Sequence, residues 1–111
     1  MTTPADPVLP GTLELLILRA LGTGELHGLG IARRIEQMTK AVFAVKAGSL
    51  FPALHRMERA GWLRSTWDAT DDGRRARFYE LTAAGRRQLD AETTRWRRVT
   101  GALAQALKGS L

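Results

Sequence analysis

The sequence contains no cysteine, so disulfide bonds and thiolate zinc sites are excluded and the fold must depend on packing. It has only two histidines, His27 and His55, and a metal site built on them has no evident third ligand. It also lacks a phosphate-binding glycine loop after a strand and a recognisable pair of catalytic carboxylates. We therefore expect no enzymatic activity, no metal and no cofactor.

Long hydrophobic runs are absent as well. The apolar stretch from Leu13 to Leu21 is interrupted by Glu14 and Arg19, and it is far shorter than the roughly 20 residues that a membrane span requires. Residues 1–10 have neither the basic start nor the apolar centre of a signal peptide, and they hold three of the four prolines. We expect a soluble, cytoplasmic protein with a flexible N-terminal arm over residues 1–10.

Acidic residues are scarce relative to basic ones. Lysine and arginine number 17 against 11 aspartates and glutamates, which gives a formal net charge of +6 and a sequence pI near 11.0. A small domain this basic favours a polyanionic partner such as DNA, RNA or an acidic protein surface. With 111 residues the chain forms one small domain, and a partner subunit would help to complete its core.

Residues 48–62 predict an amphipathic helix with a basic outer face. Helical spacing places five apolar residues on one side, namely Leu50, Ala53, Leu54, Met57 and Ala60. The other side carries Pro52, His55, Arg56 and Arg59. Ser49 is the expected N-cap, with Pro52 in the first turn, and Gly61 is the expected end. The outer face is either a nucleic-acid reader or an ordinary solvated surface.

Two helices are expected before this one. In the first, capped by Thr12, one stripe consists of Leu13, Leu16, Ile17 and Ala20, while Leu15 and Leu18 project from the opposite side. That second side needs a cover, either from another subunit or from the last helix of the same chain. The second helix turns Ile31, Ile35 and Met38 inward and Arg33 and Arg34 outward. After it, Val42, Phe43 and Val45 suggest a short extended piece over the core.

After Gly61, the residue pattern changes from that of a helix to that of extended strands. Residues 62–67 and 76–81 are rich in strand formers and flank an acidic turn at residues 68–73, which predicts a hairpin. Arg74, Arg75 and Arg77 follow the turn, so the tip of the hairpin is basic. This hairpin is either a binding wing or a solvated element.

Thr82 caps a long final helix with one apolar stripe. The stripe extends over more than six turns, which is difficult to bury within one small chain, so a dimer interface is expected. Its interface residues are Leu89, Trp96, Val99, Leu103 and Leu107. Glu92 lies within the stripe and requires water or a cationic partner.

Three helices followed by a basic hairpin predict a mainly α fold, a winged helix-turn-helix with a two-stranded β wing and a long C-terminal dimerisation helix. The expected parts are an arm at 1–10, a DNA-binding domain at 11–81 and a dimerisation helix at 82–111. The third helix would enter the major groove, and the wing would contact an adjacent phosphate or the minor groove. A winged-helix module that binds an acidic protein is the alternative.

The sequence resembles the PadR-like transcriptional regulators over nearly its whole length. Four segments carry the resemblance: GTLELLIL from Gly11, LHGLGI from Leu26, GSLFPALHRME from Gly48 and RRARFYELT from Arg74. With a single helix after the wing, the chain resembles the short subgroup of the family. The resemblance implies a homodimeric transcriptional regulator, mostly repressing, that binds an inverted-repeat operator in double-stranded DNA and is released by an effector.

The resemblance also implies which residues contact DNA. On the third helix they are Ser49, Phe51, Pro52, His55 and Arg56, and on the wing they are Arg74, Arg75 and Arg77. Arg59, Arg33 and Arg34 are added from the basic faces described above. Phe51 stands where the family commonly has tyrosine, so it brings no hydroxyl, and Lys46 replaces a small capping residue and is a further candidate for a phosphate contact.

In similar short regulators, an aromatic residue on the last helix brackets a flat ligand at the dimer centre, and Trp96 occupies that place here. The resemblance therefore implies an effector pocket for a planar aromatic or cationic molecule, formed by Trp96, Glu92, Leu15 and Leu18. The alternative is that Trp96 only fills the dimer core.

Overall fold

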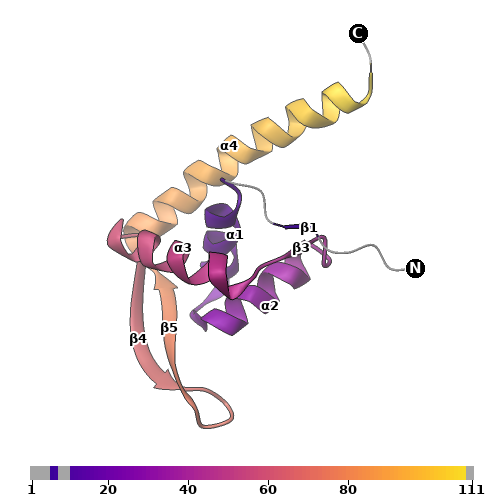
Figure 1. Cartoon of the computed structure of the whole chain (residues 1–111). Helices are drawn as coiled ribbons and strands as arrows, with labels where there is room; N and C mark the ends of the chain where they lie inside the picture. Colours follow the sequence, from indigo (N-terminus) through magenta and orange to yellow (C-terminus); the bar gives the residue numbers. More distant parts are fainter. Residues whose placement is uncertain (1–5, 8–10, 110–111) are drawn as a thin grey trace, which may run out of the picture.

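The computed structural model describes residues 6–7 and 11–109 (Figure 1). The helices are α1 (Leu13–Ala20), α2 (Gly28–Met38), α3 (Ala47–Arg59) and α4 (Ala83–Leu107), with a short 3-10 helix, η1 (Leu21–Thr23), after α1. The strands are β1 (Asp6–Pro7), β2 (Leu26–His27), β3 (Phe43–Ala44), β4 (Leu63–Ala69) and β5 (Arg75–Leu81). The fold is the predicted winged helix-turn-helix followed by a long helix.

The core lies where α1, α2 and α3 meet the base of the wing. Its fully buried large side chains include Ile17, Leu18, Ile31, Ile35, Leu54 and Tyr79. The predicted inner stripe of α3 is confirmed for Leu50, Ala53, Leu54 and Met57, whereas Ala60 is exposed. Met38 and Val42, expected to face the core, are exposed too.

The wing is a sheet of three strands in the order β2-β5-β4, all antiparallel. The predicted hairpin is present, and its turn lies at residues 70–74. The third strand, β2, was not predicted; Leu26 pairs with Tyr79 and His27 with Phe78. The pairing holds the entrance of α2 against the base of the wing.

The start of α3 differs from the prediction. Lys46, not Ser49, is the N-cap residue, with an extended backbone (φ −91°, ψ 148°) and a carbonyl that accepts from the amides of Ser49 and Leu50 at 3.0 and 2.9 Å. Pro52 therefore lies in the second turn, where it has no amide hydrogen to donate to the carbonyl of Gly48. A backbone cap leaves no side-chain signal, so the sequence pointed to Ser49.

The predicted end of α3 is confirmed. Gly61 has φ +84°, its amide donates to the carbonyl of Glu58, and the amide of Trp62 donates to the carbonyl of Met57, each at 3.0 Å. This is a Schellman motif. The carbonyl of Trp62 then accepts from the amide of Thr82 at 3.0 Å, just before α4. The backbone of Trp62 thus joins α3, β4 and α4.

The last helix, α4, packs against α1 within the same chain. Of the two covers considered for the second side of α1, the structure shows the last helix of the same chain. Thr82 caps α4 as predicted, since its hydroxyl accepts from the amide of Gly85 at 3.0 Å. Leu89 packs against the core of its own chain, whereas the predicted interface residues Leu103 and Leu107 are exposed. Figure 1 shows the second half of α4 extending beyond the other elements.

Of the N-terminal arm, the structure describes Asp6–Pro7, which pairs in parallel with β3; the rest of residues 1–10 lies outside the described part. The predicted extended piece is present as β3. Within residues 6–7 and 11–109, no helix combines the length and the apolar character that crossing a membrane requires.

Candidate nucleic-acid interface

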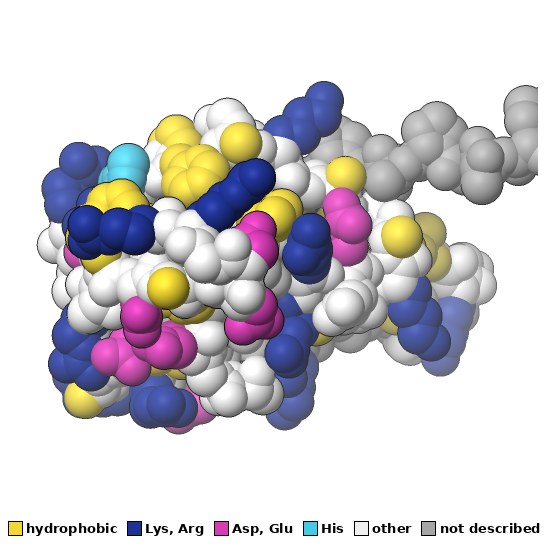
Figure 2. All heavy atoms as spheres, turned by 90° about the horizontal axis from the view of Figure 1, so that it is seen from below, with side chains coloured by type: hydrophobic (Ala, Val, Ile, Leu, Met, Phe, Trp, Pro, Cys, Tyr) yellow, Lys and Arg dark blue, Asp and Glu magenta, His cyan; other side chains and the backbone are white. Residues whose placement is uncertain are grey.

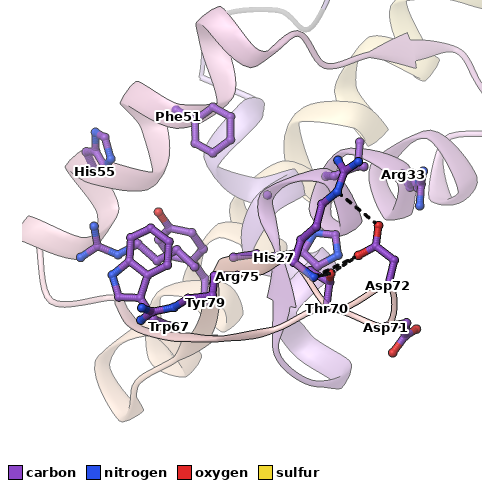
Figure 3. Close-up of a pocket in the computed structure, with 15 residues that line it drawn as sticks. His27, Arg33, Phe51, His55, Trp67, Thr70, Asp71, Asp72, Arg75 and Tyr79 are labelled. Atoms are coloured by element: carbon purple, nitrogen blue, oxygen red, sulfur yellow. Dashed lines mark hydrogen bonds and ion pairs between the residues drawn. The ribbon is translucent and has the colours of Figure 1, made fainter.

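A cleft of about 650 Å³ lies between α3 and the wing. Phe51 and His55 project into it from α3, and Trp67, Arg75 and Tyr79 line it on the wing side (Figure 3). The remaining lining residues come from the start of α2 and the tip of the wing, and they include Arg33, Arg74 and Arg77. The structure thus brings six of the predicted DNA-binding residues to one cleft.

The wing side of the cleft combines positive charge with an exposed aromatic surface. Trp67 is 60% exposed, and the guanidinium of Arg75 lies over its ring at 5.6 Å from the centroid. This cation–π contact holds the Arg75 side chain along the wing. In the view from below, hydrophobic side chains lie exposed between those of Lys and Arg (Figure 2). Such a surface suits a polyanion with flat, partly apolar groups.

The acidic turn holds one of the wing arginines. The hydroxyl of Thr70 donates to Asp72 and the amide of Arg74 lies within reach of it, and these hydrogen bonds lower the pKa of the Asp72 carboxyl. Asp72 in turn pairs with the guanidinium of Arg74 at 3.7 Å. Both groups are exposed, so a phosphate has access to Arg74. Deeper in the cleft, burial raises the pKa of Tyr79, whose phenol stays neutral.

Arg77 connects the wing to α3. The Nε of Arg77 donates to the hydroxyl of Ser65 at 2.8 Å, and that hydroxyl donates to Oε2 of Glu58 at 2.7 Å. The Nη2 of Arg77 lies 3.6 Å from the same Glu58 oxygen. The charge of Arg77 is therefore partly neutralised within the protein. This network links the wing to α3, so Arg77 has a structural role besides the predicted phosphate contact.

Arg56 lies on the other flank of α3. Its guanidinium pairs with Glu14 of α1 at 3.1 Å, and it lines a separate cavity of about 410 Å³ together with Glu92 and Arg95 of α4. The sequence placed Arg56 beside His55 on the reading face, but the structure separates them. A base contact by Arg56 would require this ion pair to open.

The other predicted contacts are distributed around these sites. Lys46, Ser49, Pro52 and Arg59 are exposed on α3 or at its start, and Arg59 lies beside His55 and Arg77. Arg34 is partly buried and donates to the hydroxyl of Thr23 at 3.2 Å. Of this group, Arg59 is the residue that continues the surface of the cleft.

Several residues of the cleft were not among the predicted contacts, and they include His27, Leu29, Trp67 and Tyr79. His27 is the N-cap of α2, since its Nδ1 accepts from the amide of Gly30 at 3.1 Å, and its ring stands edge-on to Phe78 at 5.3 Å. Histidine is not a preferred cap, so the sequence gave no signal for this role. Trp67 shares its face of β4 with the buried Leu63, but it is exposed near the tip of the wing, so the strand period gave no sign of its exposure.

The predicted effector residues meet only in part. Oε2 of Glu92 accepts from the indole nitrogen of Trp96 at 3.1 Å, and Oε1 accepts from Gln88 at 3.1 Å. Arg95 pairs with Glu92 at 3.4 Å and lies over the Trp96 ring at 5.1 Å. Leu15 is half-buried, but Leu18 is completely buried in the core and contributes no surface to a pocket, so its assignment was wrong.

No group of three or more His, Cys, Asp or Glu side chains in the described part of the chain is arranged to hold a metal ion. His27 and His55 both line the cleft. His27 caps α2, and His55 is exposed on α3.

Comparison with known proteins agrees with the geometry. The chain is 34% identical over 97 residues to the transcriptional regulator Rv3488 of Mycobacterium tuberculosis, which covers 87% of this chain and 83% of that protein. A PadR family transcription regulator from Clostridium difficile has a TM-score of 0.74 at 27% identity, covering 87% and 99% of the two chains. A PadR-like regulator from Bacillus cereus has a TM-score of 0.76 at 26% identity, covering 90% and 95%.

The family model for PadR-like transcriptional regulators matches residues 17–91, from the middle of α1 to the first turns of α4. This range includes α3, the wing and the cleft between them. With the segments, the fold and the relatives in agreement, the chain belongs to the PadR-like family of transcriptional regulators.

Proposed function

We propose that the protein is a homodimeric, sequence-specific DNA-binding repressor that a small molecule releases from an inverted-repeat operator. The observation that carries the proposal is the cleft between α3 and the wing, which gathers exposed basic and aromatic side chains on two elements joined by a hydrogen bond and an ion pair. In a winged helix-turn-helix, these two elements contact the major groove and the neighbouring backbone. Acting on chromosomal DNA places the protein in the cytoplasm.

A dimer gives the operator its symmetry. If two copies associate through α4, their α3 helices reach successive major grooves about one DNA turn, roughly 34 Å, apart. The half-sites are then inverted repeats at that spacing. Each copy contributes one α3 and one wing.

Specific binding is tested by a gel shift with the DNA upstream of the protein's own gene. At about 150 mM salt, we expect unlabelled operator to compete at least tenfold better than a scrambled duplex of equal length. Equal competition by both would contradict specific regulation and favour a different acidic partner.

The wing contact is tested with Arg75→Ala, since Arg75 is exposed at the tip. We expect weaker binding to all sequences alike and a salt dependence that is flatter by about one unit of slope. Arg98→Ala is the matched control, because it removes the same charge from an exposed site on α4. If both variants bind with the same affinity and salt slope, the wing does not contact the phosphate backbone.

For release, we propose that a planar cationic ligand binds beside Trp96. Arg95 already covers the Trp96 ring and neutralises Glu92, so a ligand must displace Arg95 and take over both contacts. Titration with a planar cationic dye should quench tryptophan fluorescence in the wild type and in Trp67→Phe, but not in Trp96→Ala. Quenching that persists in Trp96→Ala, or no quenching in the wild type, would show that Trp96 only packs.

A further inference from the structure

Phe51 is an exposed aromatic residue in the middle of the reading surface. Its side chain is 42% exposed, although the neighbouring residues Leu50, Ala53 and Leu54 already supply the inner face of α3. The other exposed positions of the helix carry alanine, glycine, serine, proline, histidine and arginine. The core therefore does not account for an unpaired phenyl ring at this position.

The start of α2 holds one edge of this ring. A Cβ atom on Gly28 would lie 2.8 Å from two ring carbons of Phe51, Cε1 and Cζ, so the ring lies against the bare backbone of Gly28. The rest of the ring faces the cleft (Figure 3). One edge of the ring is thus packed while the rest is presented outward, and this packing limits the entropy lost on binding.

The surface next to Phe51 is open to a large partner. At Gly48, one turn before Phe51, a Cβ atom would meet nothing within 4 Å. His55, one turn after it, is exposed on the same side of the helix. A duplex can therefore approach the first two turns of α3 closely.

A phenyl ring donates and accepts no hydrogen bond, so it does not read the polar pattern of the base edges. The apolar group that the major groove offers is the C5-methyl of thymine. Building on the proposed function, we propose that Phe51 determines specificity by packing on a pyrimidine C5-methyl group, one in each half-site. A tyrosine hydroxyl at this position would instead favour a polar partner.

Trp67, the other large exposed aromatic of the cleft, is unsuited to this role. Arg75 lies over its ring, and the pair stands on the wing, which faces the backbone in this type of fold. Leu29 is also exposed, 56%, but it lies at the start of α2, outside the helix expected to enter the groove. Phe51 is the large apolar side chain that α3 itself exposes.

The experiment removes only the methyl group. Operators are first selected from a random duplex library, and each thymine is then replaced by deoxyuridine. We expect affinity to fall about fourfold at one thymine per half-site, the effect of burying one methyl group. Phe51→Ala should bind thymine and uracil operators equally, Phe51→Leu should retain part of the difference, and Arg98→Ala, which lies on α4 outside the cleft, should retain all of it.

The outcomes separate this inference from the proposed function. Specific binding with no effect of uracil at any position would overturn the role of Phe51 and leave the DNA-binding proposal intact. A methyl effect that persists fully in Phe51→Ala, checked by circular dichroism to be folded, would assign it to another residue. Failure to select any operator would overturn both.

Discussion

The two halves of α4 share one helical period but have different surroundings. In the first half, Gly85 is buried and Leu89 packs against the core of the chain. In the second half, Leu103 is 57% and Leu107 87% exposed, and this segment extends away from the rest of the molecule (Figure 1). The first half of α4 packs against the core of its own chain, and the second half does not.

The difference shows what an apolar stripe in a sequence can and cannot specify. Periodicity identifies the face that requires a cover, but not the element that covers it. An isolated helix as short as the exposed half of α4 is marginal in water. A second copy of the chain is therefore the natural cover for that half. Variants in the two halves should therefore fail in different ways.

The largest effect is expected from Gly85→Ala. The added Cβ would lie 2.0 Å from the carbonyl oxygen of Trp62, a backbone atom that cannot move without disturbing the joint with α3. We expect the free energy of unfolding to fall by about 3 kcal/mol in urea titrations followed by circular dichroism. Gly101→Ala is the matched control, because nothing lies within 4 Å of its added Cβ and the helix should gain up to about 1 kcal/mol. Equal effects of the two changes would contradict the contrast between the halves.

A smaller loss is expected from Leu89→Ala, about 2 kcal/mol, because its half-buried side chain packs against the core of its own chain. This loss should be the same at low and at high protein concentration, since it acts within one chain. A loss that disappears on dilution to monomer would place Leu89 in the interface instead.

The smallest effect on the single chain, but a clear one on assembly, is expected from Leu103→Lys. A charge on the exposed stripe should weaken dimerisation at least about tenfold, which corresponds to about 1.4 kcal/mol. Sedimentation velocity over a dilution series should then show monomer at concentrations where the wild type is dimeric, with unchanged helical content. An unaltered dimer would remove the second half of α4 from the interface.

What the sequence predicted depended on the range of the interactions involved. The inner stripe of α3 and the caps at Thr82 and Gly61 follow from local spacing, and the structure has them. The strand β2 has two residues and exists through its pairing with β5, so no local pattern announced it. Local signals therefore sufficed to find the helices and the hairpin, but not the start of α3 or the strand β2.

The candidate site shows the same division. The basic character of α3 and the wing was visible in the sequence, whereas the pairing of Arg56 with Glu14 joins residues that are 42 positions apart. Which arginines are held by the protein and which are exposed depends on such distant partners. The chemistry of the interface was predictable, and its division into two flanks was not.

The backbone of Trp62 couples the orientation of α3 to that of α4. Its amide closes the end of α3 and its carbonyl accepts from the amide of Thr82 just before α4, so hydrogen bonds at one residue join the two helices. The 13 residues of α3 make a helix about 20 Å long, so a rotation of α3 by about 10° at Trp62 moves its far end by roughly 3 Å. That displacement is the length of one hydrogen bond. In the proposed dimer, a small rotation between the paired α4 helices would therefore be sufficient to move the α3 helices out of register with DNA.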